Sequence, residues 1–240
     1  MGRKANRVKH HFDTVAKRYD FMNSLLSFGI HHAWKRQAVR MMALKAGYRV
    51  LDVCAGTGDL AILAGSRIGV SGLTVLYDFN HDMMAAGRKK ISESDCPGAL
   101  TYTQGDAEQI AFPDGCFDAA MVGFGIRNLT RIRTGFEEMY RVLKPGGTMM
   151  CLEFSKPTSP FFRWFYDVYS FYVMPFLGEL IAGSRTAYTH LPESIRTFPL
   201  PDVLSEMLYR IGFSNVTCNY LTNGIAVIHL ARKDEKRVNR

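Results

Sequence analysis

The fold is decided by the stretch Val50-Leu51-Asp52-Val53-Cys54-Ala55-Gly56-Thr57-Gly58-Asp59. An apolar run leads directly into closely spaced glycines, and a segment with helical spacing follows over 59–68. Glycine at such a junction lets the backbone turn tightly and lets a ligand approach the main chain. The loop also fits the G-x-G-x-x-A pattern of dinucleotide sites, so the glycines alone do not decide between cofactors.

Apolar runs and helical spacing alternate on both sides of this loop. The alternation predicts a parallel sheet with helices on both faces, since parallel strands need crossover connections. A turn is expected at Pro145-Gly146-Gly147. The expected strands are 48–54, 73–78, 100–104, 117–122 and 148–154, and the expected helices between them are 59–68, 81–91 and 132–143.

The two ends of the chain have a different pattern from the α/β centre. Helices are expected over 7–19 and 32–44, with a loop at 24–29 between them. After Ser155 the sequence is rich in aromatic residues without a clear strand. A helix over 201–211 and a hairpin of 216–221 with 226–230 follow, turning at Asn223-Gly224. The expected division is a helical lid (1–44), a cofactor-binding core (45–155), an aromatic insertion (156–198), a C-terminal helix and hairpin (199–232) and a charged tail (233–240).

Composition narrows the class of protein. The chain has 240 residues, of which 47% are hydrophobic and 22% charged, as in a globular protein. The most apolar segment, 160–182, is interrupted by charged residues and Pro175, so no membrane span is expected. Five scattered cysteines without a C-x-x-C pair predict neither a metal site nor a disulfide framework, which favours the cytoplasm. The net charge of +8 favours an anionic partner or simply solubility.

Acidic residues near the glycine loop favour one cofactor class. Asp52 lies on the strand before the loop, where a carboxylate repels a pyrophosphate but not the cationic S-adenosylmethionine. Asp78 ends the next strand and is expected to bind ribose hydroxyls, with a helix N-terminal acid as the alternative. Asp106 and Ala107 follow the third strand, where an adenine would lie, and a turn role for Asp106 is the alternative.

Two longer stretches carry a family resemblance. The segment Tyr19-Asp20-Phe21-Met22-Asn23 through Trp34 closely resembles the N-terminal signature of the ubiquinone/menaquinone biosynthesis C-methyltransferases. Arg141-Val142-Leu143-Lys144-Pro145-Gly146-Gly147 through Ser155 resembles their second signature, and Phe124-Gly125-Ile126-Arg127-Asn128 is also similar. The similarity extends over nearly the whole chain, from about 12 to 230.

The resemblance implies a class I, Rossmann-like methyltransferase with a seven-stranded, mostly parallel sheet and an antiparallel last strand. It implies S-adenosylmethionine as cofactor and a prenylated quinol as substrate. Cys54 stands where other methyltransferases often have the first glycine of the loop. The expected cofactor-binding residues are Asp52, Gly56, Thr57, Gly58, Asp78, Phe79, Asp106, Ala107 and Gly123.

Methylation of a ring carbon sets the expectations for catalysis. The reduced quinol is the nucleophile, and ionising a hydroxyl of pKa near 10 at pH 7 costs about 4 kcal/mol. We expect Arg127 to stabilise the phenolate and Asn128 to orient the ring, with an Arg127–Glu153 ion pair as the alternative. His31 and Asp20 are candidates for a base or a lid contact, and fixing the N-terminal helices is the alternative.

The sequence is compatible with more than one acceptor and partner. Demethylmenaquinol is the preferred substrate, with a methoxy-polyprenyl-benzoquinol, or both, as the alternative. A prenyl tail and the aromatic stretch 160–176 favour peripheral contact with the inner face of the membrane, with an insertion buried against the sheet as the alternative. A homodimer is left open. Three other functions are considered for this sequence: a nicotinamide oxidoreductase, a nucleic-acid methyltransferase and a non-catalytic cofactor-binding protein. The sequence lacks the N/D-P-P-Y/F tetrad and the Pro-Cys pair of nucleic-acid enzymes, so no nucleic-acid partner is expected.

Overall fold

The computed structural model describes residues 19–168 and 193–235. Its sheet has seven strands in the order β3-β2-β1-β4-β5-β7-β6. Strands β1 to β5 are parallel, and β7 lies antiparallel between β5 and β6. The strands are β1 Arg49–Val53, β2 Leu73–Asp78, β3 Ala99–Gln104, β4 Phe117–Gly123, β5 Leu143–Phe154, β6 Phe213–Leu221 and β7 Ala226–Lys233. This order confirms the predicted Rossmann-like sheet with an antiparallel last strand.

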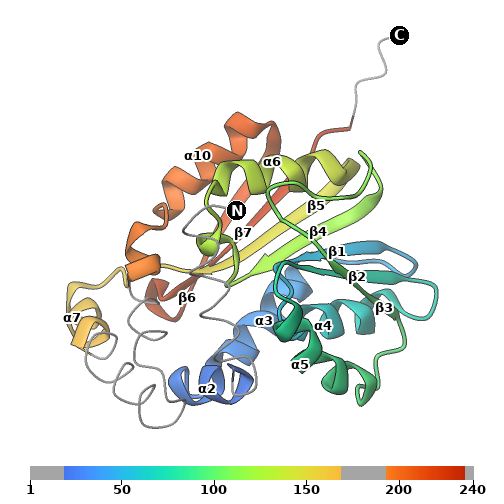
Figure 1. The fold of residues 1–240 in the computed structure, drawn as a ribbon. Helices are drawn as coiled ribbons and strands as arrows, with labels where there is room; N and C mark the ends of the chain where they lie inside the picture. Colours follow the sequence, from blue (N-terminus) through green and yellow to red (C-terminus); the bar gives the residue numbers. More distant parts are fainter. Residues whose placement is uncertain (1–18, 169–192, 236–240) are drawn as a thin grey trace.

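Helices cover both faces of this sheet (Figure 1). Helices α6 and α10 lie on one face, where Phe136 and Leu204 are buried in one hydrophobic core. Helices α3 and α4 lie on the other face, where Ala38 and Ala64 belong to a second core. The described helices are α2 Tyr19–Leu26, α3 Ile30–Met41, α4 Asp59–Ile68, α5 His81–Ser92, α6 Ile132–Val142, α7 Pro160–Val168 and α10 Pro201–Ile211, with short 3-10 helices η2 Ile126–Asn128 and η4 Thr222–Gly224.

The N-terminal helices differ from expectation in their boundary. The predicted loop over 24–29 is wrong at its start, because α2 continues to Leu26. The Ser27 hydroxyl donates to the Asn23 carbonyl and satisfies a helix-end acceptor there. Between α2 and α3, Phe28 and Gly29 have positive φ, 50° and 72°, and these two residues end the helical path of the backbone. Most of the predicted helix over 7–19 lies outside the described residues.

The Pro145-Gly146-Gly147 segment is a bulge rather than a separate turn before the strand. Strand β5 starts at Leu143 instead of the predicted Thr148. Along β4, Phe117 pairs with Leu143 and Ala119 pairs with Thr148, so the extra residues of β5 are looped out between these pairs.

The C-terminal part follows the prediction closely. Helix α10 ends at Gly212, which has φ 115° and closes the helix in the left-handed conformation. Strands β6 and β7 form the expected hairpin through η4, and β7 pairs with β5 to join it to the sheet. Of the aromatic insertion, only 156–168 and 193–198 lie in the described part, and the division into lid, core and insertion stays a prediction.

Candidate active site

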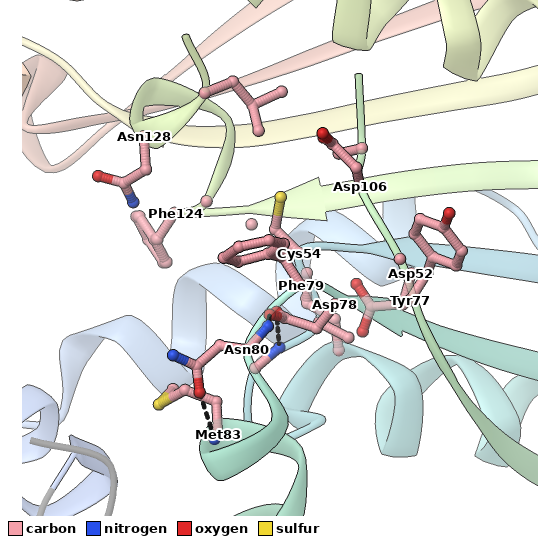
Figure 2. A pocket seen from close by; sticks show the side chains of 18 of the residues that line it. Asp52, Cys54, Tyr77, Asp78, Phe79, Asn80, Met83, Asp106, Phe124 and Asn128 are labelled. Atoms are coloured by element: carbon pink, nitrogen blue, oxygen red, sulfur yellow. Dashed lines mark hydrogen bonds between the residues drawn. The ribbon is translucent and has the colours of Figure 1, made fainter. Parts of the chain in front are cut away.

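A cavity of about 410 Å³ opens where β1, β2, β3 and β4 end. This is the carboxyl edge of the parallel strands, where doubly wound sheets bind their ligands. The volume lies in the range of small-molecule sites. Figure 2 shows side chains reaching it from separate loops, among them Asp78, Asn80, Asp106 and Phe124.

The glycine loop forms one wall of this cavity. Gly58 precedes the first residue of α4 and has φ 86°, which favours glycine. A Cβ at this position would lie 2.8 Å from the Leu76 side chain. Gly56 and Thr57 line the cavity, whereas Gly58 packs behind it. Cys54 also has positive φ, 55°, which confirms that a side chain stands at a glycine-like position in this chain. Burial and the nearby Asp78 raise the pKa of the Cys54 thiol, so the thiol stays protonated.

Asp78 joins this loop to the start of α5. Its carboxylate accepts one hydrogen bond from the Gly56 amide and one from the Asn80 amide, both at 2.7 Å. The cap of α5 is Asn80, whose Oδ1 accepts from the Met83 amide at 2.9 Å (Figure 2). Because Asn80 caps the helix, the Asp78 carboxylate retains acceptor capacity toward the cavity. Burial raises the pKa of Asp78 against the opposing effect of these amide donors.

Asp52 carries a carboxylate oxygen without a partner in the described part of the chain. The residue is only 1% exposed, and its Oδ2 accepts no hydrogen bond. Burial and the charge of Asp78 raise the pKa of Asp52 well above its usual range. A buried carboxylate with one unpaired oxygen beside a cavity fits a ligand with positive charge, because such a ligand supplies the missing partner.

The loop after β3, where an adenine was expected, forms the end of the cavity opposite the glycine loop. Asp106 Oδ1 accepts from the Glu108 amide at 2.8 Å, so Asp106 makes the turn contact that was the alternative while also lining the cavity. A Cβ at Gly105 would lie 2.0 Å from the Tyr77 hydroxyl, so only glycine fits against that ring. Glu108 accepts from Arg131 Nε at 2.7 Å and thereby connects the loop after β3 to the loop after β4.

Arg127 is bound on the protein side of the site. Its Nη1 lies 2.6 Å from Glu153 Oε1 and donates to the Phe124 carbonyl, and its Nε donates to the Ser194 hydroxyl. It is 8% exposed and is not among the described residues that line the cavity. The sequence offered an ion pair with Glu153 as the alternative to phenolate binding, and this ion pair is present. The contact with a phenolate stays a prediction.

Asp20 and His31 lie behind the glycine loop rather than in the cavity. Asp20 Oδ1 accepts from the Thr57 hydroxyl at 2.7 Å, and Asp20 Oδ2 pairs with Lys90. His31 is buried, its Nε2 lies 3.1 Å from the Ser24 hydroxyl, and its ring stacks on His32. Burial, with Lys35 and His32 nearby, lowers the pKa of His31 to about 4. Asp20 thus joins α2 to the glycine loop, and His31 packs within the N-terminal helices, while a role as a base stays a prediction for both residues.

Lys35 and Arg131 are cavity residues that no sequence motif indicated, and Phe124 also lines the cavity although its motif predicted roles only for Arg127 and Asn128. Lys35 comes from α3, far from the glycine loop in the chain, and pairs with Asp59 at 2.6 Å. Phe124 packs against Phe154 with ring centres 4.4 Å apart. The predicted residues that do line the cavity are Asp52, Gly56, Thr57, Asp78, Phe79, Asp106, Ala107, Gly123 and Asn128.

Within the described residues, one group lies close enough to hold a metal ion, namely His31, His32 and Asp59. Asp59 already pairs with two ammonium groups, those of Lys35 and Lys90. Burial acts to raise the pKa of Asp59, but these two lysines outweigh it and lower the pKa. A divalent cation would have to compete with both lysines, so the chemistry of the group does not fit a metal.

Comparison with known proteins agrees with this geometry. Residues 1–233 match the ubiE/COQ5 methyltransferase family. The chain belongs to that family. It is 42% identical over 230 residues to the ubiquinone/menaquinone biosynthesis C-methyltransferase UbiE of Francisella philomiragia, covering 96% of this chain and 92% of the relative. It is 44% identical over 232 residues to the UbiE of Methylococcus capsulatus, covering 96% and 93%.

A solved structure shows the same fold. A SAM-dependent methyltransferase from Thermotoga maritima aligns with a TM-score of 0.65 at 18% identity, covering 94% of this chain and 99% of that one. As a member of the ubiE/COQ5 family the chain is a C-methyltransferase that depends on S-adenosylmethionine. The site fits this cofactor: Asp78 can take the ribose, Asp106 and Ala107 the adenine, and Asp52 and Thr57 the methionine end. The sulfonium of the bound cofactor supplies the methyl group.

Proposed function

We propose that this enzyme methylates a ring carbon of a prenylated quinol, and that demethylmenaquinol is its substrate. The proposal is carried by identity of 42–44% over 96% of the chain to relatives named for ubiquinone and menaquinone biosynthesis. The alternative acceptor is the methoxy-benzoquinol of ubiquinone biosynthesis, which the same names include. Both acceptors are electron-rich rings whose ionised hydroxyl activates the neighbouring carbon.

The cavity supports a flat aromatic acceptor. Phe124 lines the cavity and stacks against Phe154, and Trp34 lies 6.3 Å from Phe124 between ring centres. These rings provide an apolar wall for a quinol beside the glycine loop. Asn128 lines the same wall and has an amide that can bind a ring oxygen. Arg127 acts as a positioning residue, since it binds the Phe124 carbonyl and holds the turn that carries Phe124 and Asn128.

The protein works at a membrane surface, where its prenylated substrate resides. Phe28 is 86% exposed beside α2, and Trp164 is 63% exposed on α7. Large exposed aromatic side chains are typical of the membrane–water interface. No helix among the described residues has the length and apolar character needed to cross a bilayer. The scattered cysteines of the enzyme favour the cytoplasm, and the exposed aromatic side chains favour peripheral contact with the inner face of the membrane. A homodimer stays a prediction.

The experiment offers labelled S-adenosylmethionine to the purified protein with two acceptors, a reduced demethylmenaquinone analogue and a reduced methoxy-benzoquinone analogue. We expect label on the naphthoquinol. The oxidised quinones serve as matched controls, because their ring carbons are electrophilic and should take no label. Label on the benzoquinol alone would favour the alternative acceptor. Label on neither acceptor, with the cofactor bound, would contradict the proposal.

A further inference from the structure

Lys35 is a buried lysine of the cavity lining, and its ammonium group lies near Asp59 and Phe124, which line the cavity as well. It lies on α3, is 8% exposed and lines the cavity. Its Nζ donates to Asp59 Oδ2 at 2.6 Å and lies 6.0 Å from the centre of the Phe124 ring. A lysine ammonium has three donors, and burial makes an unused donor costly. The ammonium is therefore placed to bind an acceptor within the cavity.

The charges that line the cavity make this lysine exceptional. The acidic residues of the lining are Asp52, Asp59, Asp78, Asp106 and Glu108, whereas its basic residues in the described part are Lys35 and Arg131. Arg131 is paired with Glu108 in the loops after β3 and β4, at the adenine end. Lys35 stands at the other end, where Asp59 begins α4 after the glycine loop.

S-adenosylmethionine has two positive groups, its sulfonium and its ammonium, and one negative group, its carboxylate. A cavity lined by acids attracts the first two and repels the third. If Asp52 and Thr57 take the methionine end, as their places in the cavity allow, the carboxylate lies near the start of α4, where Lys35 is the lining cation. From these observations we infer that Lys35 binds the α-carboxylate of the cofactor. The inference rests on the cofactor alone and does not depend on the identity of the quinol.

A second lysine makes this role compatible with the Lys35–Asp59 pair. Lys90 of α5 also pairs with Asp59 and with Asp20. Burial acts to lower the pKa of Lys90, but these two carboxylates outweigh it and raise the pKa. Because Lys90 neutralises Asp59 from the other side, Lys35 can share its donors between Asp59 and an incoming carboxylate. Lys90 is not among the described residues that line the cavity.

The test compares three ligands by titration calorimetry. S-adenosylhomocysteine carries the carboxylate, its decarboxylated analogue keeps only the amine, and 5′-methylthioadenosine lacks both groups. In Lys35→Gln we expect the affinity for S-adenosylhomocysteine to fall by about 10- to 100-fold, the range for a lost charge-assisted hydrogen bond. The affinities for the other two ligands are expected to change by less than about threefold, since neither has a carboxylate to lose.

Two further variants separate recognition from folding. Lys35→Arg keeps a cation and is expected to keep most of the preference for S-adenosylhomocysteine over methylthioadenosine. Lys89→Gln is the matched control, because it removes an exposed ammonium of α5 that pairs with Glu93 and touches neither Asp59 nor the cavity, and it should leave that preference unchanged. Equal losses for all three ligands in Lys35→Gln would show that Lys35 only ties α3 to α4, and would overturn the inference. An unchanged affinity for S-adenosylhomocysteine would overturn it as well.

Discussion

The Thr57 hydroxyl donates a hydrogen bond to Asp20 Oδ1 over 2.7 Å and thereby joins the glycine loop to helix α2. Thr57 lines the cofactor cavity, whereas Asp20 lies outside it and is bound on its other oxygen by Lys90. A single carboxylate thus connects the N-terminal helices, the glycine loop and α5. The cofactor site and the N-terminal helices are for this reason expected to stabilise one another.

Replacing Asp20 tests this connection. Asp20→Ala removes the acceptor of Thr57 and the partner of Lys90 together, so we expect the affinity for S-adenosylhomocysteine to fall roughly tenfold. Asp20→Asn keeps an acceptor for Thr57 and loses only the ion pair, so its effect should be smaller. Calorimetric titration of both variants measures the difference. Wild-type affinity in Asp20→Ala would show that the cofactor does not sense the α2 contact.

The Arg127–Glu153 pair predicts a large effect on stability. Arg127→Ala leaves the Glu153 carboxylate buried without its cation, which typically costs about 3–5 kcal/mol. The double replacement Arg127→Met with Glu153→Leu removes both charges and should recover most of that loss. Urea unfolding of the single and double variants measures this coupling. If the single and the double variant lose the same free energy of unfolding, the unpaired Glu153 charge is not the cause of the loss.

Turnover in an Arg127 variant is a separate prediction. Arg127 binds the Phe124 carbonyl, and Phe124 and Asn128 line the cavity. Arg127→Ala should therefore lower kcat sharply and leave the cofactor affinity nearly intact, since Arg127 contacts neither the glycine loop nor Asp78 or Asp106. Arg127→Lys keeps a donor for the Phe124 carbonyl or for Glu153 but not for both. Its kcat should lie between those of the wild type and Arg127→Ala. Unchanged kcat in Arg127→Ala would remove this residue from the mechanism.

The sequence predicted cavity residues where their place depends on local order along the chain. Gly56 follows one strand and Asp78 ends the next, and parallel strands bring their carboxyl ends to one edge; Thr57 was expected from the family resemblance, and all three line the cavity. Lys35 was missed because its position depends on how α3 packs beside α4, which no local pattern encodes. Arg131 was missed for a similar reason, since its partner Glu108 belongs to another loop.

Arg127 was expected to contact a phenolate and His31 to act as a base or a lid contact. These contacts depend on the direction of the side chain, which a sequence motif does not specify. Both residues occupy the neighbourhood that the motifs predicted, but each side chain is bound by the protein. Arg127 turns to Glu153 because a buried guanidinium needs several acceptors, and the Phe124 carbonyl, Ser194 and Glu153 supply them. His31 turns to Ser24 because α2 continues past the predicted loop boundary and brings that hydroxyl to the ring.

The buried histidine makes stability sensitive to acid. The pKa of His31 is about 4 in the folded protein against an ordinary 6.5, mainly because burial penalises its charged form. Between these values the unfolded chain binds more protons, so stability falls as the pH drops below 6.5. From pH 7.5 to 5.5 this residue is expected to cost about 1.4 kcal/mol. Urea unfolding at both pH values measures the loss. His31→Gln should show a smaller loss, and an equal loss in the variant would exclude His31 as the cause.

Asp52 predicts the opposite pH dependence and separates folding from cofactor binding. Burial and Asp78 raise the pKa of Asp52, so the folded protein binds its proton more tightly than the unfolded chain does. Stability therefore falls as the pH rises from the ordinary value of 3.8 toward the raised one. Asp52→Asn keeps the shape without the ionisable group, so the variant should unfold at a higher urea concentration than the wild type at pH 8. Lower stability of the variant at pH 8 would mean that the carboxylate is ionised and stabilising in the ligand-free protein.

The Asp52→Asn variant should also bind S-adenosylhomocysteine about 10- to 100-fold more weakly than the wild type, because the unpaired Oδ2 can no longer offer charge to the ligand's ammonium. Unchanged cofactor affinity would place the ammonium elsewhere in the cavity.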